Sequence, residues 1–398
     1  MPVDSAEVVI LGAGIAGCAL AYHLVQRHVG PVALFDPSTP GAGATGRAAG
    51  IVTEQLWNEW DVEVTRESKE QYSAQSARWD PSAYTVNGFV RWARGAVANT
   101  VLSAALGRLR SWGVDVRPLD PDELRQKVPW GRFDDGPRAV WSPHDAVVTP
   151  STMGEIYAEG ARQGGAEFLL GTPMESFGRE SDAWELRTAG RVLRARTAVI
   201  AAGAWSKKLL RGLGHPLPLA PYRTQAAVLR PPSGPVVFPS VHDIDADVYA
   251  RPEANGRVLA GDGTQLVEVD PEAFRTGADE SFVTHLAETF DQRFPGWADA
   301  EMVRAWAGVC ASTPDRRPLV GPVPGADGLY AVTGFNGFGV MRAGGVSLRL
   351  AELIASGGTG NRELARLGPV LPSRFTGTPG DFTPRPGFTL DDGDAPRF

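Results

Sequence analysis

A glycine motif between two apolar strands places the strongest constraint on the fold of this chain. Residues 8–11 are apolar, a G-x-G-x-x-G spacing and a helical stretch follow, and a second apolar run, 32–35, ends in Asp36. The glycines of such a unit give a tight turn, a close backbone approach to a pyrophosphate, and close packing of helix on strand, while the terminal acid accepts hydrogen bonds from a ribose. A Gly-rich turn is the simpler alternative, but every part of the unit is in register. The pattern therefore predicts a dinucleotide site at the helix N-terminus. Its motif residues are Gly12, Gly14, Ile15, Ala16 and Gly17.

A glycine-rich loop follows Asp36 and is too long for an ordinary turn. Its density of small residues indicates close approach of the backbone to a ligand, although a flexible linker would have a similar composition. Arg47 is the only charged residue between positions 37 and 50, and a guanidinium there can pair with a phosphate. The candidate cofactor-binding residues of this loop are Pro37, Gly43, Ala44, Thr45, Arg47, Gly50 and Ile51.

Composition narrows the partners and the cellular setting. The net charge of −7 and the pI of about 5.5 do not favour a nucleic-acid partner. Two cysteines, Cys18 and Cys310, and six scattered histidines give no disulfide framework and no ligand-spaced cluster, so no metal is expected. No apolar run approaches the ~18 residues of a membrane span. The first strand lies so close to residue 1 that we expect no signal peptide and a cytoplasmic protein.

The strand and helix patterns predict a mixed α/β chain with two regions. A discontinuous, Rossmann-like nucleotide-binding domain is expected from residues 1–60, 145–215 and 315–370. An antiparallel-sheet substrate domain is expected from the intervening residues, 61–144 and 216–314, and a polar Pro/Gly-rich tail from 371–398.

Within the substrate domain, the local patterns predict helices and short strands. Residues 61–78 indicate a polar, exposed helix, and residues 279–290 a second helix. Apolar alternation predicts strands at 225–229, 247–251 and 257–260. Residues 216–315 as a whole are typical of a β-rich region.

Four motifs, taken together, resemble a family of FAD-dependent amine and amino-acid oxidoreductases. That family includes D-amino-acid oxidase, glycine oxidase, sarcosine oxidase and the flavin subunits of proline and dimethylglycine dehydrogenases. The resemblance covers about residues 6–370, and the order and spacing of the motifs carry it. They are residues 12–17 with Asp36, residues 43–50, residues 199–206, and residues 306–315 followed by 334–341.

The resemblance implies FAD in an extended form, with its isoalloxazine ring between the two domains. It implies that Met174 contacts the adenine through backbone atoms and that the turn at Gly203 flanks the cofactor. A C–H next to an amine nitrogen would give a hydride to flavin N5 and leave an imine, which water hydrolyses; no metal or protein nucleophile is needed. The other implied cofactor residues are Ala202, Trp205, Gly308, Asn336, Gly337, Phe338, Gly339, Val340 and Met341.

This sequence departs from the family pattern around the substrate and the flavin. Cys310 and Met341 stand where relatives have an Arg and a Lys that bind a substrate carboxylate. Arg251, two residues after Tyr249, is the candidate replacement, with an ordinary surface arginine as the alternative. Tyr249, Arg251, Cys310 and Met341 are thus the candidate catalytic-site residues.

Two further departures concern the flavin itself. Leu259 or Ala260 occupies the position of the oxygen-activating Lys of sarcosine-type oxidases, so we expect slow use of oxygen and another electron acceptor. Gly308 matches the cysteine that attaches flavin in those oxidases, so non-covalent FAD is expected.

Three functions remain open from the sequence. The first is oxidation of a secondary or tertiary amine or an amino acid, and the second is oxidation of a 2-hydroxy acid on the same fold. The third is a non-catalytic FAD subunit of a larger complex. The sequence leaves the oligomeric state open.

Overall fold

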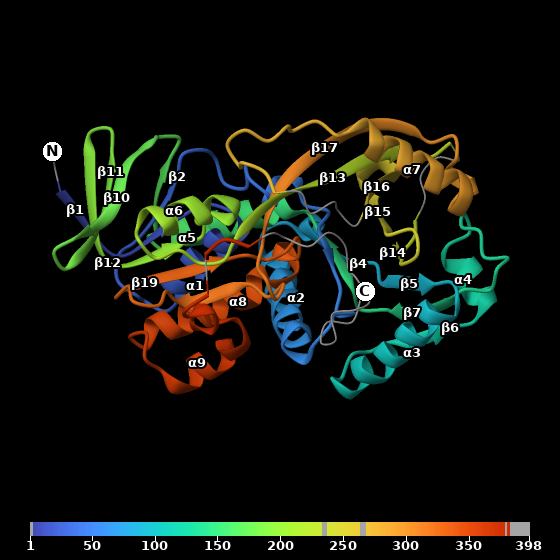
Figure 1. Cartoon of the computed structure of the whole chain (residues 1–398), viewed down its shortest axis with the longest axis horizontal. Coiled ribbons are helices and arrows are strands. Elements are labelled where there is room, and N and C mark those ends of the chain that lie inside the picture. The colour runs from blue at the N-terminus through green and yellow to red at the C-terminus, as the bar shows by residue number, and fades with distance from the viewer. Residues whose placement is uncertain (1–2, 233–236, 263–267, 379, 383–398) are drawn as a thin grey trace.

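The computed structural model describes residues 3–232, 237–262, 268–378 and 380–382. Two large sheets dominate it, and they lie in the two halves of the molecule shown in Figure 1. Helix α2 (Glu59–Trp79) runs between the halves. No helix of the described ranges is long and apolar enough to cross a bilayer.

The first sheet has a parallel centre, in which the neighbours run β9, β2, β1, β12 and β19. Antiparallel strands extend it on the β12 side, and β18 pairs antiparallel with β19. Its strands within the described ranges are β1 (Val3–Leu11), β2 (Val32–Asp36), β9 (Glu167–Leu170), β10 (Met174–Glu180), β11 (Ala183–Thr188), β12 (Arg191–Ile200), β18 (Leu319–Pro322) and β19 (Leu329–Thr333).

Alternate residues of β1 enter two different cores, as the pleat of a strand requires. Val8 and Ile10 face α1 (Ile15–Gln26), α5 (Pro150–Gln163) and α8 (Gly339–Ala355). Val9 and Leu11 face the hairpin β10–β11 and α6 (Ser206–Gly212). Apolar side chains thus cover both faces of the parallel centre, which explains why its strands have continuous apolar sequences.

The second sheet is antiparallel except where β5 and β14 pair in parallel. Its order is β17-β13-β16-β15-β14-β5-β7-β6. The strands are β5 (Phe89–Ala93), β6 (Arg117–Leu119), β7 (Arg138–Ser142), β13 (Ala220–Arg230), β14 (Ser240–Asp243), β15 (Val248–Glu253), β16 (Arg257–Asp262) and β17 (Glu301–Ser312).

The outer side of the second sheet is packed by aromatic residues. The rings of Trp130 and Trp297 stack with centroids 3.6 Å apart, in a core that includes residues of α4 (Pro121–Lys127) and α7 (Glu280–Arg293). Helix α3 (Ala96–Ser111) packs near β5 and β7 in a separate core. The cavity described below lies on the other side of this sheet.

The remaining elements are a small third sheet and the last helix. A small sheet contains β3 (Ile51–Val52), β8 (Ala146–Val148) and β4 (Tyr84–Val86), and α9 (Asn361–Leu367) follows α8. Residues 371–378, which the sequence assigns to the tail, are folded in part: Pro372 is buried, and the Arg374 guanidinium pairs with Asp315 at 2.7 Å. The later tail residues 379 and 383–398 lie outside the described ranges.

The fold class is confirmed: the chain is mixed α/β, with a parallel sheet carrying the glycine motif and a mostly antiparallel second sheet. The prediction of a polar, exposed helix at 61–78 is half wrong. The helix is present, but one face is buried against α8, where Gly345 N donates to Ser68 Oγ at 2.8 Å and a Cβ on Gly345 would overlap the Val64 carbonyl. Two of the buried polar residues of α2, Ser68 and Lys69, have hydrogen-bond or ionic partners within the protein.

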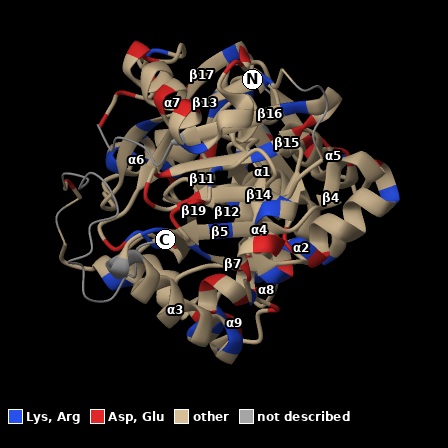
Figure 2. Cartoon of the chain, turned by 90° about the vertical axis from the view of Figure 1, so that its right-hand side faces the viewer, with Lys and Arg blue, Asp and Glu red and all other residues tan. Residues whose placement is uncertain are grey.

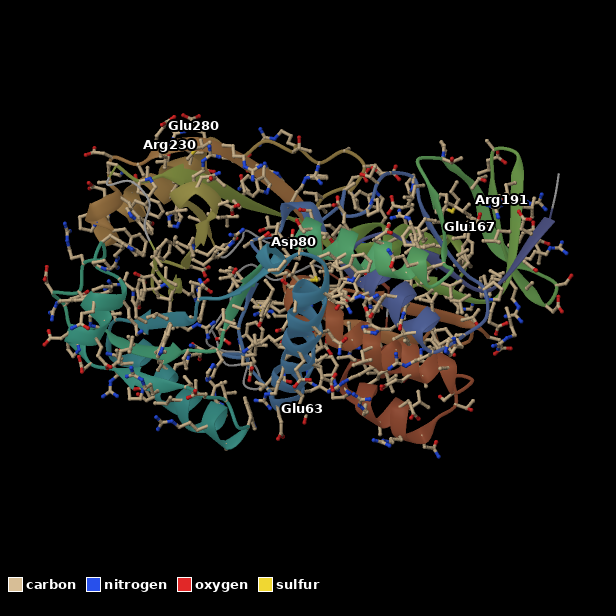
Figure 3. All side chains as sticks on the ribbon, turned by 180° about the vertical axis from the view of Figure 1, so that it is seen from behind. Glu63, Asp80, Glu167, Arg191, Arg230 and Glu280 are labelled. Atoms are coloured by element: carbon tan, nitrogen blue, oxygen red, sulfur yellow. The ribbon has the colours of Figure 1, made fainter. Side chains whose placement is uncertain are left out.

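Charges are mixed along the elements rather than collected by sign, as Figure 2 shows. Figure 3 labels one pair at the far end of the first sheet, where Arg191 of β12 contacts Glu167 of β9 at 2.8 Å. Arg191 also pairs with Asp4 of β1 at 2.6 Å. These side chains bridge three strands at their edge, away from the cavity.

Candidate active site

One cavity of about 1830 Å³ runs from the glycine motif to the inner face of the second sheet. It brings together all but two of the candidate cofactor-binding and catalytic-site residues predicted from the sequence. Tyr249 and Cys310 line it, as do Gly12, Gly14, Ile15, Ala16, Asp36, Pro37, Gly43, Ala44, Thr45, Arg47, Gly50, Ile51, Met174, Ala202, Gly203, Trp205, Gly308, Asn336, Gly337, Phe338, Gly339, Val340 and Met341. The two residues outside the lining are Gly17 and Arg251.

The turn from β1 into α1 depends on glycine for two different reasons. Gly12 has φ of 119°, and a Cβ there would overlap the Ala201 carbonyl. A Cβ on Gly17 would overlap the Gly12 carbonyl, so Gly17 serves packing and lies behind the cavity wall. Gly14 differs: it caps α1 and lines the cavity, and the nearest atom to an added Cβ is Thr45 Oγ1 at 3.4 Å. Its missing side chain leaves the helix N-terminus open to a ligand.

Two side chains fix the backbone around this open helix end. Asp36 Oδ2 accepts a hydrogen bond from Ala13 N at 2.8 Å, and Thr45 Oγ1 accepts one from Ile15 N at 3.0 Å. The first turn of α1 contains no acidic residue. The partial positive charge of the helix N-terminus is therefore not neutralised locally, and it can hold a phosphate group.

The glycine-rich loop lies between this helix end and the second sheet. Arg47 turns back onto its own loop, where Nη1 donates to the carbonyls of Ala42 and Gly43, the latter at 3.1 Å. Trp306 Nε1 donates to the Arg47 carbonyl at 3.1 Å. A Cβ on Gly308 would lie 3.2 Å from the Arg47 Cβ. The loop is thus fastened to β17 at the position where the resemblance places the flavin.

The loop between β19 and α8 forms a second wall. Asn336 has φ of 55°, its Oδ1 accepts from Ser312 Oγ at 2.8 Å and from Thr313 N at 3.1 Å, and its Nδ2 donates to the Gly334 carbonyl at 2.7 Å. The Tyr72 hydroxyl donates to the Val340 carbonyl at 2.7 Å. These contacts fix the start of α8, whose first N–H groups lie at the cavity.

Cys310 lies on β17 beside this loop. Its sulfur interacts with the Tyr222 hydroxyl and with the Gly337 backbone N–H, and burial raises the pKa of the thiol to about 11. A thiol with this pKa stays protonated near neutral pH and is a poor nucleophile. The environment of Cys310 therefore does not favour covalent attachment through its sulfur.

The polar wall of the cavity is a row across three neighbouring strands. Arg91 of β5 pairs in register with His242 of β14, which pairs with Tyr249 of β15. All three residues line the cavity. Tyr249 pairs in turn with Gly261 of β16, where a Cβ would overlap the Tyr249 hydroxyl. Gly261 thereby provides the space that the tyrosine ring occupies.

A family model described as FAD dependent oxidoreductase matches residues 7–353. The chain belongs to this FAD-dependent oxidoreductase family. Human mitochondrial dimethylglycine dehydrogenase is 26% identical over 89% of this chain, which spans only 43% of that protein. Glycine oxidase of Geobacillus kaustophilus (strain HTA426) is 25% identical, over 87% of this chain and 92% of the relative. The crystal structure of L-proline dehydrogenase from P. horikoshii superposes with a TM-score of 0.84 at 24% identity, covering 94% of this chain and 99% of that one.

The residues of the cavity fit the FAD that gives the family its name. The open N-terminus of α1 suits the pyrophosphate, and the Asp36 carboxylate at the end of β2 suits a ribose. Gly43 and Gly337 line the cavity without a side chain. A Cβ on Gly337 would lie 3.2 Å from the Tyr222 hydroxyl. The α8 N-terminus offers N–H groups to an anionic flavin ring. Among the described residues, no cluster of His, Cys, Asp or Glu could hold a metal.

The structure corrects the prediction for Arg251. Its side chain does not line the cavity: Nε donates to the Ala49 carbonyl, Nη1 to the Pro252 carbonyl at 2.7 Å, and Nη2 pairs with Glu253 at 2.7 Å. Arg251 therefore supports the glycine-rich loop from behind. Leu259, the register partner of Arg251 on β16, is buried. Neither Leu259 nor Ala260 lines the cavity.

Arg91 is one of the cavity residues that sequence reasoning missed, together with His242 and Trp57. It is 6% exposed, its Nη1 donates to the Gln55 carbonyl at 2.9 Å, and burial lowers the pKa of its guanidinium to about 10, so it remains charged at neutral pH. A sequence signal existed: Arg91 is the one charged residue in β5, whose residues are all buried. An arginine inside a buried strand needs a polar surrounding, and here the cavity provides it.

A buried ionic network holds the segment that follows β3. Lys69 Nζ lies 2.7 Å from Glu54 Oε1 and 3.2 Å from Asp145 Oδ1. The Thr53 hydroxyl donates to Asp145 Oδ2 at 2.6 Å. Removing one partner of such a buried pair would leave the other charge buried without a counter-charge, which is strongly destabilising. The network therefore fixes the backbone that leads to Gln55.

Aromatic residues close the cavity near the start of α8. The rings of Trp57 and Phe338 meet edge to face with centroids 4.5 Å apart. Behind them, Arg342 Nε lies 3.0 Å from Asp61 Oδ1, and both side chains are buried. Burial raises the pKa of the Asp61 carboxyl, while Arg342 acts to lower it. Met341 lines the cavity beside this group.

Proposed function

We propose that this protein is an FAD-dependent enzyme that oxidises the C–N bond of a secondary or tertiary amine or an amino acid to an imine. The observation that carries the proposal is a continuous cavity of about 1830 Å³, which joins an open helix N-terminus to a polar row on the second sheet. When bound, FAD supplies a hydride acceptor for a C–H bond next to the nitrogen. The similarity to glycine oxidase and dimethylglycine dehydrogenase supports an amine donor.

The protein's own residues would bind, orient and shield the reactants. Asp36, Thr45 and the first turn of α1 hold the nucleotide half of FAD. The loop fixed by Asn336 and the first turn of α8 would offer N–H groups to the flavin ring. The Trp57 and Phe338 rings exclude water from the reacting end and favour an unprotonated nitrogen.

One observation favours a second candidate, the oxidation of a 2-hydroxy acid. An alcohol must lose its hydroxyl proton, and His242 lines the cavity with Nε2 3.6 Å from Asp247 Oδ1. A histidine supported by a carboxylate can act as a general base. Amine oxidation needs no such base, because the neutral amine already carries its lone pair.

Anaerobic reduction of the FAD-loaded protein separates these functions. A panel of secondary amines, tertiary amines, amino acids and 2-hydroxy acids is mixed with the protein, and bleaching of the oxidised flavin is followed. We expect amines to reduce the flavin. Reduction by hydroxy acids alone would establish the second candidate, and bound FAD that no compound reduces would indicate a non-catalytic subunit.

A further inference from the structure

We propose that Arg317 binds the carboxylate of the substrate and thereby determines specificity. This inference rests on the proposed amine oxidation. Arg317 lies on the loop between β17 and β18. It follows by seven residues Cys310, the position at which the resemblance expects a carboxylate-binding arginine. The assignment depends on the backbone of Arg317, on the contacts of its side chain and on the charges around it.

The backbone of Arg317 is fixed by hydrogen bonds on both sides of its Cα. Its N–H donates to Asp315 Oδ1 at 3.1 Å. Its carbonyl accepts from Thr313 Oγ1 and from Arg374 Nη2, each at 2.8 Å. Thr313 N donates in turn to Asn336 Oδ1 at 3.1 Å, in the loop that leads into α8. The loop that carries Arg317 is therefore tied to the second wall of the cavity.

The side chain of Arg317 is half-buried and lines the cavity. Among the residues that the structure describes, its guanidinium has no hydrogen-bond or ion-pair partner. Two other cations of the lining are engaged, because Arg47 donates to carbonyls of its own loop and Lys208 pairs with Glu272 at 2.8 Å. Arg317 can thus bind a ligand without first losing a contact to a described residue.

The carboxylates around Arg317 are paired with other arginines. Asp315 Oδ2 lies 2.7 Å from Arg374 Nε. Asp61 Oδ1 lies 3.0 Å from Arg342 Nε. Burial raises the pKa of the Asp61 carboxyl and lowers the pKa of the Arg342 guanidinium, and the positive charge of Arg317 acts to lower both. In this group three arginines meet two carboxylates, so one positive charge remains to attract an anion.

The Asp61–Arg342 pair locates Arg317 at the α8 end of the cavity. The guanidinium carbon of Arg342 lies 5.3 Å from the ring centre of Phe338 and 5.8 Å from that of Trp57. A carboxylate that loses its water at this aromatic wall needs a cation, and a guanidinium can meet it with two parallel hydrogen bonds. A substrate would therefore place its carboxylate on Arg317 and its apolar part against the two rings.

The first test compares a substrate that carries a carboxylate with the corresponding carboxamide, using whichever amine of the panel reduces the flavin. In Arg317→Gln, kcat/KM for the carboxylate should fall about tenfold or more, the order expected when hydrogen bonds between charged groups are lost. The carboxamide should lose much less, because a neutral acceptor forms a weaker hydrogen bond with a guanidinium. Arg362→Gln removes the same charge from an exposed position on α9 and should change neither.

A binding measurement tests Arg317 without turnover. In the wild type, propionate should perturb the absorption spectrum of the oxidised flavin at concentrations where propionamide does not, and Arg317→Gln should remove this difference. Arg317→Lys keeps the charge but loses the paired geometry, so it should retain only part of the preference. The FAD content and melting temperature of Arg317→Gln should match those of the wild type, because the side chain engages no described residue.

Equal losses for carboxylate and carboxamide, or no loss for either, would overturn the assignment. Loss of folding or of FAD in Arg317→Gln would also overturn it, since the side chain would then have a structural role. An amine panel that reduces the flavin with no preference for carboxylates would contradict this inference and leave the proposed function intact. If no amine reduces the flavin, the proposed function fails, and the propionate titration still decides whether Arg317 binds a carboxylate.

Discussion

The hydroxyl of Tyr249 occupies the space above Gly261, where any β-carbon would overlap it. The two residues are register partners on β15 and β16, so the glycine sets the position of a tyrosine that lines the cavity. This relationship gives a direct way to move one wall of the site without changing its chemistry.

Gly261→Ala should displace the Tyr249 ring into the cavity. Inserting a methyl group into a packed site typically costs about 1–3 kcal/mol, and we expect substrate binding to weaken about tenfold or more. The FAD content should stay near that of the wild type. Gly178→Ala on β10, where an added Cβ meets no atom within 4 Å, is the matched control. Unchanged kinetics in Gly261→Ala would show that Tyr249 does not contact the substrate.

Substitutions at two glycines of the motif should affect cofactor binding and folding separately. Gly14→Ala fits the protein but points into the cavity, so we expect a folded protein whose apoprotein melting temperature is unchanged and whose affinity for FAD is at least tenfold weaker. Gly17→Ala should instead fail to fold, because its Cβ would overlap the Gly12 carbonyl. Flavin-to-protein ratios and thermal unfolding measure both effects. Full FAD content in Gly14→Ala would place the pyrophosphate elsewhere.

The FAD should be released by denaturation. Gly308 has no side chain to form a bond, and burial raises the pKa of the Cys310 thiol to about 11, which keeps it protonated. Acid precipitation should therefore leave the yellow colour in the supernatant. Colour that stays with the pellet in the wild type and leaves it in Cys310→Ser would identify Cys310 as the attachment point.

A buried histidine should make the fold sensitive to acid. His23 is 3% exposed between aromatic rings, and burial lowers its pKa to about 3 from the ordinary 6.5. The unfolded chain takes up a proton below pH 6.5 and the folded protein does not, so this group reduces the free energy of unfolding as the pH falls from 6.5 toward 3.

The effect approaches about 1.4 kcal/mol per pH unit inside that window. His23→Leu should remove this part of the slope when unfolding is measured at saturating FAD. His285→Gln, at an exposed position on α7, is the control. Parallel pH profiles for wild type and His23→Leu would disprove this account of His23.

The sequence identified the cofactor end of the site well and the substrate end poorly. The G-x-G-x-x-G unit and the glycine-rich loop depend on local backbone requirements, so their spacing alone pointed to Gly12, Gly14 and the loop residues of the cavity wall, whereas the residues at 174, 202–205 and 308–341 came from the family resemblance. Arg91 depends on the pairing of β5 with β14, between segments about 150 residues apart, which no local pattern reveals.

Arg251 and α2 show two further limits of sequence reasoning. Strand alternation correctly places Arg251 on the same face as Tyr249, but it does not show that the Ala49 carbonyl engages the guanidinium. The polar composition of α2 indicated exposure, yet Lys69 and Asp61 are buried with charged partners from other segments. In both cases the deciding contact is long-range.

Reduced protein should react slowly with oxygen. A positive charge beside the flavin speeds electron transfer to oxygen by stabilising superoxide. Leu259 and Ala260 supply no charge at the position where the resemblance expects a lysine. The Arg47 guanidinium, which does line the cavity, is engaged by the carbonyls of Ala42 and Gly43. After anaerobic reduction, mixing with aerated buffer should reoxidise the flavin slowly, whereas a quinone or dye should do so quickly. Reoxidation by oxygen much faster than that of free flavin, with stoichiometric peroxide, would identify an oxidase.

The most direct test of the central claim is a single anaerobic turnover with an open-chain secondary amine that reduces the flavin. The account predicts that each reduced flavin is accompanied by one carbonyl product and one released amine, because the imine that leaves the site is hydrolysed by water. The rate of flavin reduction should also rise with pH as the substrate nitrogen loses its proton. Flavin reduction without cleavage of the C–N bond would contradict the proposed function.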